Sequence, residues 1–222
     1  PYDPRATSQV ADLRSVLAEA GLPNTDFDAV QQLLQFGLSP RLVLEIHQAG
    51  FKTDSIGHWM EIAIHNIRPD MLRAFKEAGL EDLSIEDLVE CKIHRITPAF
   101  IQSFRDLGIN DLSMEDLVEL RIHKVSAERL MEFRELLGDE IQLGDVIEFS
   151  IHHVTPRTVA AFRAAGYETL TREELIECRI HHVSPEYLAQ MQETGLNLTL
   201  EEMIECRIHH VRPALVRDYY EV

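Results

Sequence analysis

Apolar residues through most of the chain recur at the three- and four-residue spacing of helices that are buried on one side. In residues 98–107 this stripe consists of Ile101, Phe104 and Leu107. Gly108 follows at a position where glycine commonly ends a helix. The pattern therefore predicts a short amphipathic helix over residues 98–107.

A second apolar stretch follows over residues 113–123. Ser113 and Asp116 have the spacing of a capping box, in which each side chain accepts a hydrogen bond from the other residue's backbone N–H. The residues expected to bury one side are Leu117, Val118, Leu120 and Ile122. These features predict a second short helix that ends near His123.

This pair of helices recurs along the chain. A phrase of isoleucine, histidine, a variable residue and isoleucine or valine returns at intervals of 29, 29, 29, 29 and 28 residues, with its histidines at His65, His94, His123, His152, His181 and His209. A fixed period of this length is typical of a solenoid. We predict an all-α fold, one α-solenoid of about seven two-helix repeats over residues 1–222. The repeats begin near residues 10, 39, 68, 97, 126, 155 and 184, with a partial eighth over 212–222.

The start of each repeat has its own signature. Thr97 is a good N-cap, and Pro98 occupies the first helical position, where its missing N–H is not needed. Ile96 and Ile101 flank this cap with the spacing of a hydrophobic staple. The first repeat resembles the others least, as expected of a terminal capping repeat.

Composition narrows the classes of partner. The net charge of −17 argues against binding to nucleic acid, because phosphate binding depends on lysine and arginine. It argues equally against an anionic membrane surface, and no apolar run approaches the ~20 residues that span a bilayer. Cys91, Cys178 and Cys206 share a position that holds Leu120 and Phe149 in other repeats, so we expect buried thiols.

The segments 111–125 and 170–187 resemble the short helical repeats of a bacterial family, in which such repeats follow the membrane part of beta-lactam-sensor-type metallopeptidases and occur in other envelope or regulatory proteins. The resemblance extends well over residues 39–222 and weakly over 10–38. It implies a soluble segment of the bacterial cytoplasm or periplasm. The family's peptidase motif, His-Glu-x-x-His, is absent, so no catalytic residue carries over. The family commonly has glycine after Ile-His, whereas this chain has other residues there, and we expect its turn to differ.

Histidines form two columns. One contains the histidine of each phrase, and the other follows it in the last three repeats. Equivalent residues of packed helices lie about 8–10 Å apart, whereas zinc needs nitrogens at about 2.0–2.1 Å. We therefore interpret the histidines as helix-end residues that hydrogen-bond the last carbonyls. The alternative, a metal site, has as its candidates His152, His153, His181, His182, His209 and His210.

Basic residues share one position on the first helix of four repeats, and we identify this column as the candidate binding site: Lys76, Arg105, Arg134 and Arg163. Stacked repeats would align these residues in a row that attracts an acidic partner, on a chain that is otherwise acidic. Alternatively, glutamates of neighbouring repeats, such as Glu77 and Glu135, neutralise them. An acidic column on the second helices is interpreted as solvated surface: Glu61, Glu90, Glu119, Glu148, Glu177 and Glu205.

The chain contains no glycine-rich phosphate loop, no Gly-x-Ser-x-Gly and no Cys-x-x-Cys, so we predict a protein without enzymatic activity and without a cofactor. The predicted function is a helical-repeat scaffold for protein–protein or peptide interaction. One alternative is a metal or small-ligand sensor that uses the histidine-rich C-terminal half. Another is a structural spacer or accessory tail of a larger protein.

Overall fold

The computed structural model describes residues 4–80 and 82–220, with side chains placed for 8–80 and 82–217. Over these residues the chain forms fifteen α-helices and no strand, which confirms the predicted all-helical repeat fold. The helices are α1 (Pro4–Glu19), α2 (Phe27–Gln35), α3 (Pro40–Gln48), α4 (Ile56–Ile64), α5 (Pro69–Glu77), α6 (Ile85–Ile93), α7 (Pro98–Arg105), α8 (Met114–Ile122), α9 (Ala127–Leu137), α10 (Leu143–Ile151), α11 (Pro156–Ala164), α12 (Arg172–Ile180), α13 (Pro185–Gln192), α14 (Leu200–Ile208) and α15 (Pro213–Tyr220).

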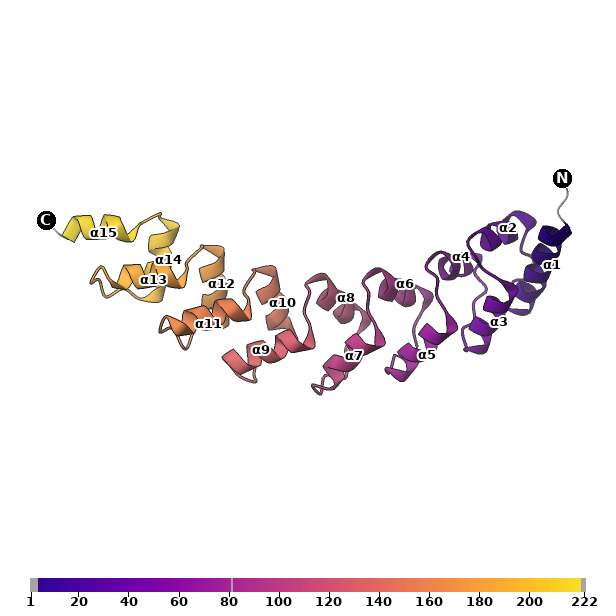
Figure 1. The fold of residues 1–222 in the computed structure, drawn as a ribbon, viewed down its shortest axis with the longest axis horizontal. Coiled ribbons are helices and arrows are strands. Elements are labelled where there is room, and N and C mark those ends of the chain that lie inside the picture. Colours follow the sequence, from indigo (N-terminus) through magenta and orange to yellow (C-terminus); the bar gives the residue numbers. More distant parts are fainter. Residues whose placement is uncertain (1–3, 81, 221–222) are drawn as a thin grey trace. The chain divides into compact units, whose positions relative to one another are not determined.

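The contacts divide the chain into an N-terminal part, Pro1–Val118, and a C-terminal part, Glu119–Val222. Within the N-terminal part, α1, α3, α5 and α7 pack in series as one layer, and α2, α4 and α6 pack in series as a second (Figure 1). In the C-terminal part, α9 packs against α10 and α11, and α13 packs against α14 and α15. None of the helices among the described residues is long and apolar enough to cross a membrane.

The first helix of a repeat begins as its sequence predicts. Thr97 has extended backbone dihedrals, and its side chain accepts a hydrogen bond of 3.1 Å from the backbone N–H of Phe100. Ile96 and Ile101, the two members of the staple, are both buried. The same arrangement of cap and staple fixes the entry of α3, α9, α11 and α13. The first repeat differs, because α1 begins at Pro4 rather than near residue 10.

Glycine ends the first helix because the chain turns through left-handed backbone there. Gly108 has φ +80°, its N–H donates to the carbonyl of Arg105 at 2.8 Å, and the N–H of Ile109 reaches the carbonyl of Phe104 at 3.1 Å. These two bonds form a Schellman motif, which satisfies carbonyls that the helix leaves open. At Gly79 the guanidinium of Arg105 also occupies the space that a Cβ would need.

The second helices begin with the predicted capping boxes. The backbone N–H of Ser113 donates to Asp116 at 2.8 Å, and the N–H of Asp116 donates to the Ser113 hydroxyl at 3.1 Å. The reciprocal pair recurs at α6, α12 and α14. Because each helix has only about nine residues, and such helices are marginal in isolation, these caps and the interhelical packing carry its stability.

The turn between repeats departs from our expectation. The six residues after Ile-His all have positive φ, between 51° and 58°: Asn66, Arg95, Lys124, His153, His182 and His210. The turn therefore has the left-handed conformation that glycine favours, and the expectation of a different turn is wrong. The reason lies in the next residue. Val125 is buried, and its N–H bonds to the carbonyl of Leu120 at 2.8 Å, so packing and hydrogen bonding together hold Lys124 in this conformation.

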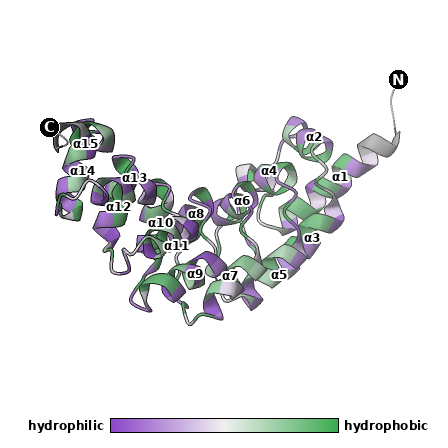
Figure 2. Ribbon diagram, turned by 60° about the vertical axis from the view of Figure 1, so that its left-hand side comes forward, coloured by the Kyte–Doolittle hydropathy of each residue, from purple (hydrophilic) through white to green (hydrophobic). Residues whose placement is uncertain are grey.

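The cores are built from a few buried side chains per helix. In the C-terminal part the rings of Phe133 and Phe149 pack at 4.8 Å between centroids. Cys91 and Cys178 are buried as predicted, and burial raises the pKa of each thiol to about 12. Cys206 is half-buried, and all three cysteines are free thiols. Hydrophobic and hydrophilic residues interleave along the helices (Figure 2), as the short amphipathic stripes require.

Candidate functional site

The predicted basic column lies on the first helices, where most of its members bind backbone carbonyls of the preceding repeat. Lys76 donates to the carbonyl of Ala49 at 3.5 Å, and Arg105 donates to that of Gly79 at 3.4 Å. In the C-terminal part, Arg163 donates to the carbonyl of Leu136. Each acceptor is at the C-terminal end of the preceding first helix, where carbonyls lack partners and the helix dipole attracts a positive charge.

Arg134 is the exception. It donates at 3.0 Å to the carbonyl of Ile141, in the loop of its own repeat. The acceptors of the column are therefore carbonyls, and Glu77 and Glu135, proposed from the sequence, are not the groups that these hydrogen bonds use. Lys76 and Arg105 lie on the contacting helices α5 and α7, and Arg134 and Arg163 lie on the contacting helices α9 and α11. Both pairs have a structural role that competes with recognition of a partner.

A charge reversal on α11 tests this role. Arg163→Glu is expected to lower the free energy of unfolding by about 1–2 kcal/mol, because it removes a hydrogen bond and places a carboxylate beside helix C-termini. Arg157→Glu makes the same charge change in the first turn of the same helix, where a carboxylate is favoured, and should cost nothing. Urea denaturation of both variants measures the difference, and an equal loss would assign the effect to net charge alone.

The histidine columns lie at the ends of the second helices. His65, His94, His152, His181 and His209 are C-cap residues, which confirms their predicted position. Their backbone N–H groups donate to the carbonyl of the glutamate four residues earlier, in the last turns of the helix. The second column, His153, His182 and His210, occupies the left-handed turn position. Among the described residues, no group of three or more His, Cys, Asp or Glu side chains is placed to hold a metal ion.

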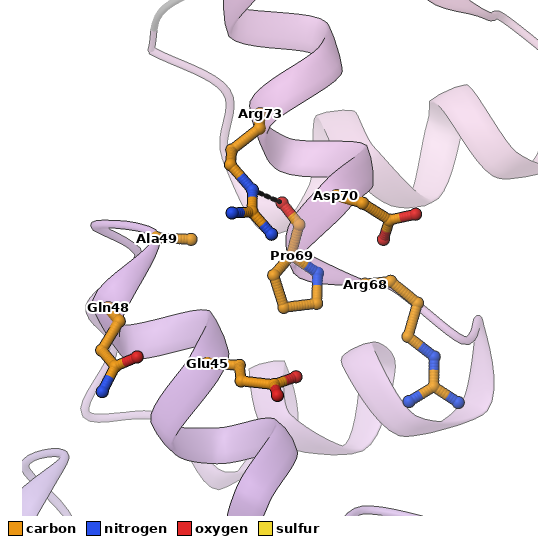
Figure 3. A pocket seen from close by; sticks show the side chains of 7 residues that line it. All are labelled: Glu45, Gln48, Ala49, Arg68, Pro69, Asp70 and Arg73. Carbon is orange, nitrogen blue, oxygen red and sulfur yellow. Dashed lines mark hydrogen bonds between the residues drawn. The ribbon is translucent and has the colours of Figure 1, made fainter.

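The N-terminal part also has an open hollow of about 530 Å³ between α3 and α5 (Figure 3). Glu45 and Gln48 line it from α3, Asp70 and Arg73 line it from α5, and Arg68 lines it from the cap before α5. Arg73 Nε donates to the carbonyl of Pro69 at 3.3 Å. The lining mixes two cationic with two anionic side chains, so the hollow favours no charge of ligand.

The isoleucine of the repeated phrase is exposed, contrary to the prediction that Ile122 is buried. Ile122 is 56% exposed, whereas Leu117 and Leu120 on the same helix are buried and Val118 is half-buried. The equivalent residues are exposed to a similar extent in the five other repeats that contain the phrase: Ile64 53%, Ile93 60%, Ile151 49%, Ile180 49% and Ile208 43%. At about 100° per residue, Ile122 is roughly 200° around the helix from Leu120, which explains the result. The sequence contained this signal.

Each of these isoleucines has a glutamate three residues before it, which places both on one helix face. We name this surface the isoleucine–glutamate stripe. In the C-terminal part it consists of Ile122, Ile151, Ile180 and Ile208 with Glu119, Glu148, Glu177 and Glu205. Glu119, Glu177 and Glu205 are exposed, and Glu148 is half-buried. The N-terminal part carries two equivalent pairs, Glu61 with Ile64 and Glu90 with Ile93.

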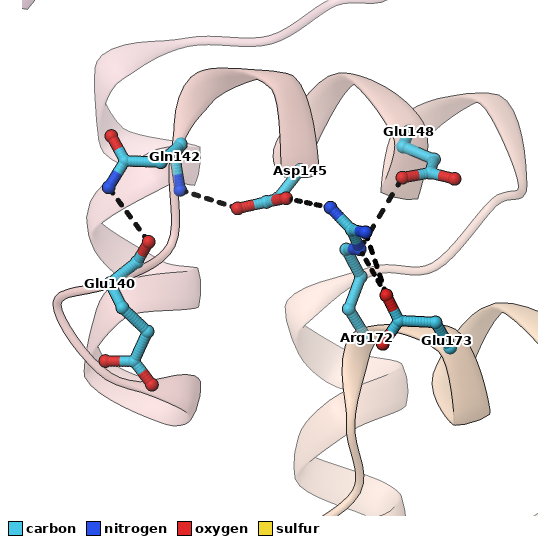
Figure 4. Close-up of polar contacts among 6 residues, drawn as sticks. All are labelled: Glu140, Gln142, Asp145, Glu148, Arg172 and Glu173. Carbon is cyan, nitrogen blue, oxygen red and sulfur yellow. Dashed lines mark hydrogen bonds and ion pairs between the residues drawn. The ribbon is translucent and has the colours of Figure 1, made fainter.

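Two contacts join successive second helices of the C-terminal part. Arg172, the first residue of α12, pairs with Asp145 and with Glu148 Oε2 at 3.7 Å on α10 (Figure 4). On its own helix it pairs with Glu173 at 2.8 Å. Arg207 of α14 donates to the carbonyl of His182, after α12, at 3.2 Å. Helices α10, α12 and α14, which carry Ile151, Ile180 and Ile208, are therefore held side by side.

Arg172 also affects the charge of this surface. A hydrogen bond from its own backbone and another from Arg172 hold the pKa of Glu173 below its ordinary value. Because Arg172 is shared among three carboxylates, it cannot neutralise the surface. Acidic side chains therefore outnumber the single arginine at this place between α10 and α12.

Comparisons of the chain with protein-family models, with curated proteins and with solved structures found no match. The function is therefore inferred from the geometry of the chain itself.

Proposed function

We propose that the chain is a non-enzymatic helical-repeat scaffold that binds a protein or peptide partner through the isoleucine–glutamate stripe. The observation that carries the proposal is the recurrence of an exposed isoleucine at one position of the six repeats that contain the Ile-His phrase. Single exposed aliphatic residues are ordinary on protein surfaces, whereas an aligned series on a rigid scaffold is typical of interaction sites.

The other two candidate surfaces have structural roles, which agrees with the proposal. The basic column is engaged with backbone carbonyls, and the histidines form helix ends. We also propose that the repeats are related to the bacterial repeats they resemble, which supports a role in the bacterial cytoplasm or periplasm. A surface of exposed isoleucines on several helices suits macromolecular partners better than a small substrate, which binds in an enclosed pocket.

Affinity capture with three immobilised forms of the full chain tests the proposal. The first is the unmodified chain, and the second is Ile151→Ser with Ile180→Ser. The third, Met131→Ser with Leu215→Ser, removes two side chains that are 46% and 51% exposed and lie on first helices, away from the stripe. We expect a partner from extracts of the native organism that is retained by the unmodified chain and by the third form, and lost from the second.

Circular dichroism should give the same helical signal for all three forms, because each substitution is at an exposed site. If the second and third forms retain the same proteins as the unmodified chain, or lose them equally, the stripe is not the binding surface.

A further inference from the structure

We infer that the occupant of the stripe in the C-terminal part is a cationic amphipathic helix, with apolar residues that recur about every seven residues. The inference rests on the proposed function and specifies the class of partner. Two properties of the stripe lead to it: the sign of its charge and the distance between its isoleucines.

The charge selects the sign of the partner. Three of the four glutamates in this part are exposed, and each lies one helical turn before its isoleucine. A partner that covers the isoleucines must bring its own flanking residues close to these carboxylates. Lysine or arginine there gains attraction, whereas acidic residues, nucleic acid or an anionic membrane would be repelled. Two copies of this chain, joined stripe to stripe, would bring their glutamates together, which disfavours a symmetric dimer through this surface.

The spacing selects the conformation of the partner. Packed helices lie about 8–10 Å apart. Because side-chain contacts join α10 to α12 and α12 to α14, we expect a similar distance between the isoleucines of successive repeats. Seven residues of a helix advance about 10.5 Å and return to nearly the same face. Three residues of an extended strand also advance about 10 Å, but residues i and i+3 of a strand are on opposite faces. A helix can therefore contact each isoleucine in turn, whereas a strand misses every second one.

The length of the stripe sets the length of the partner. Ile122, Ile151, Ile180 and Ile208 define three intervals, which span about 24–30 Å. A helix of about 20 residues is about 30 Å long and matches this span. The occupant is thus a helical segment of about six turns, with its apolar face on the isoleucines and its basic flank on Glu177 and Glu205.

Fluorescence anisotropy with synthetic peptides tests the inference on the full chain. The probe is a labelled peptide of about 21 residues with leucines on one helical face and lysines elsewhere. The first control is a scrambled isomer with the same composition but no apolar face. The second control replaces every lysine by glutamate. We expect the probe to bind at least about tenfold more tightly than either control, equivalent to about 1.4 kcal/mol.

Variants of the chain locate the binding. Ile151→Ser with Ile180→Ser should weaken the probe at least about tenfold, and Met131→Ser with Leu215→Ser should leave it unchanged. Glu177→Gln with Glu205→Gln should weaken binding and reduce its dependence on salt, because these glutamates are exposed and unscreened only at low ionic strength. Glu148 is left intact because it pairs with Arg172.

Three outcomes would overturn the inference. Equal affinity for the probe and its scrambled isomer would show general attraction to an acidic chain. Insensitivity to the isoleucine variant would place the peptide elsewhere. Sedimentation showing a dimer that Ile151→Ser with Ile180→Ser dissociates would identify a second copy as the occupant. A partner captured through the stripe, combined with failure of the probe, would refute the inference and leave the proposed function standing. Failure of both experiments would refute both.

Discussion

Leu117→Ala is expected to lower the free energy of unfolding by about 2–5 kcal/mol, the range for truncating a buried leucine. Leu117 lies in the second turn of α8 with no exposed surface, among the core side chains of the N-terminal part. Its removal leaves a cavity that short helices on either side cannot fill without losing their own contacts. Urea denaturation followed by circular dichroism measures the shift in midpoint.

Glu119→Ala is the matched control, two residues away on the same helix and exposed. It should change the free energy of unfolding by no more than about 0.5 kcal/mol. Equal midpoints for the two variants would contradict the assignment of buried and exposed faces on α8. A smaller urea m-value for Leu117→Ala would show that repeats unfold separately, as nearest-neighbour coupling in solenoids allows.

Lys124→Val is expected to cost roughly 1–3 kcal/mol, because a β-branched side chain is strongly disfavoured at positive φ. Lys124 has φ 55°, and the buried Val125 that follows keeps the backbone in this conformation. Lys124→Gly should instead be neutral or stabilising. It relieves about 1–2 kcal/mol of left-handed strain and loses part of this gain to the greater entropy of unfolded glycine.

Lys124→Leu is the control for the loss of charge and the gain of apolar character. Leucine is uncharged and apolar like valine, but it is not β-branched. In thermal or urea unfolding, Lys124→Gly should be the most stable of the three variants, Lys124→Leu intermediate and Lys124→Val the least stable. If valine and leucine are equally stable, the turn relaxes to another conformation, and the left-handed geometry is not required by the fold.

Helix positions could be predicted from the sequence because local signals agree with one another. Ser113 with Asp116 marks a helix start, and Gly108 marks a helix end, independently of the tertiary structure. The turn after His123 was predicted less well, because Lys124 gives no local sign of positive φ. That conformation is imposed by the burial of Val125, a tertiary effect that exceeds the local preference of lysine.

The candidate site was harder to predict for a different reason. Lys76 and Arg105 have the spacing of a recognition row, but spacing does not reveal their acceptors, which are carbonyls of the previous repeat. The exposed isoleucines looked like core residues because they are apolar and adjoin buried ones. The helical spacing of Ile122 and Leu120 already places them on opposite sides of the helix. Only the hydrophobic character of isoleucine argued for a buried side chain.

The two connections between helices differ in whether they tolerate added residues. At the turn after Ile-His, one buried residue such as Val125 both closes the preceding helix and opens the next, so an added residue there would break both functions. The opposite connection, from the terminal glycine to the next cap, has four residues between Gly108 and Ser113 and three between Gly138 and Gln142. Foreign segments, such as a fluorescent reporter or an extra binding loop, should therefore be inserted between Ile109 and Leu112, where the chain already accepts variation in length.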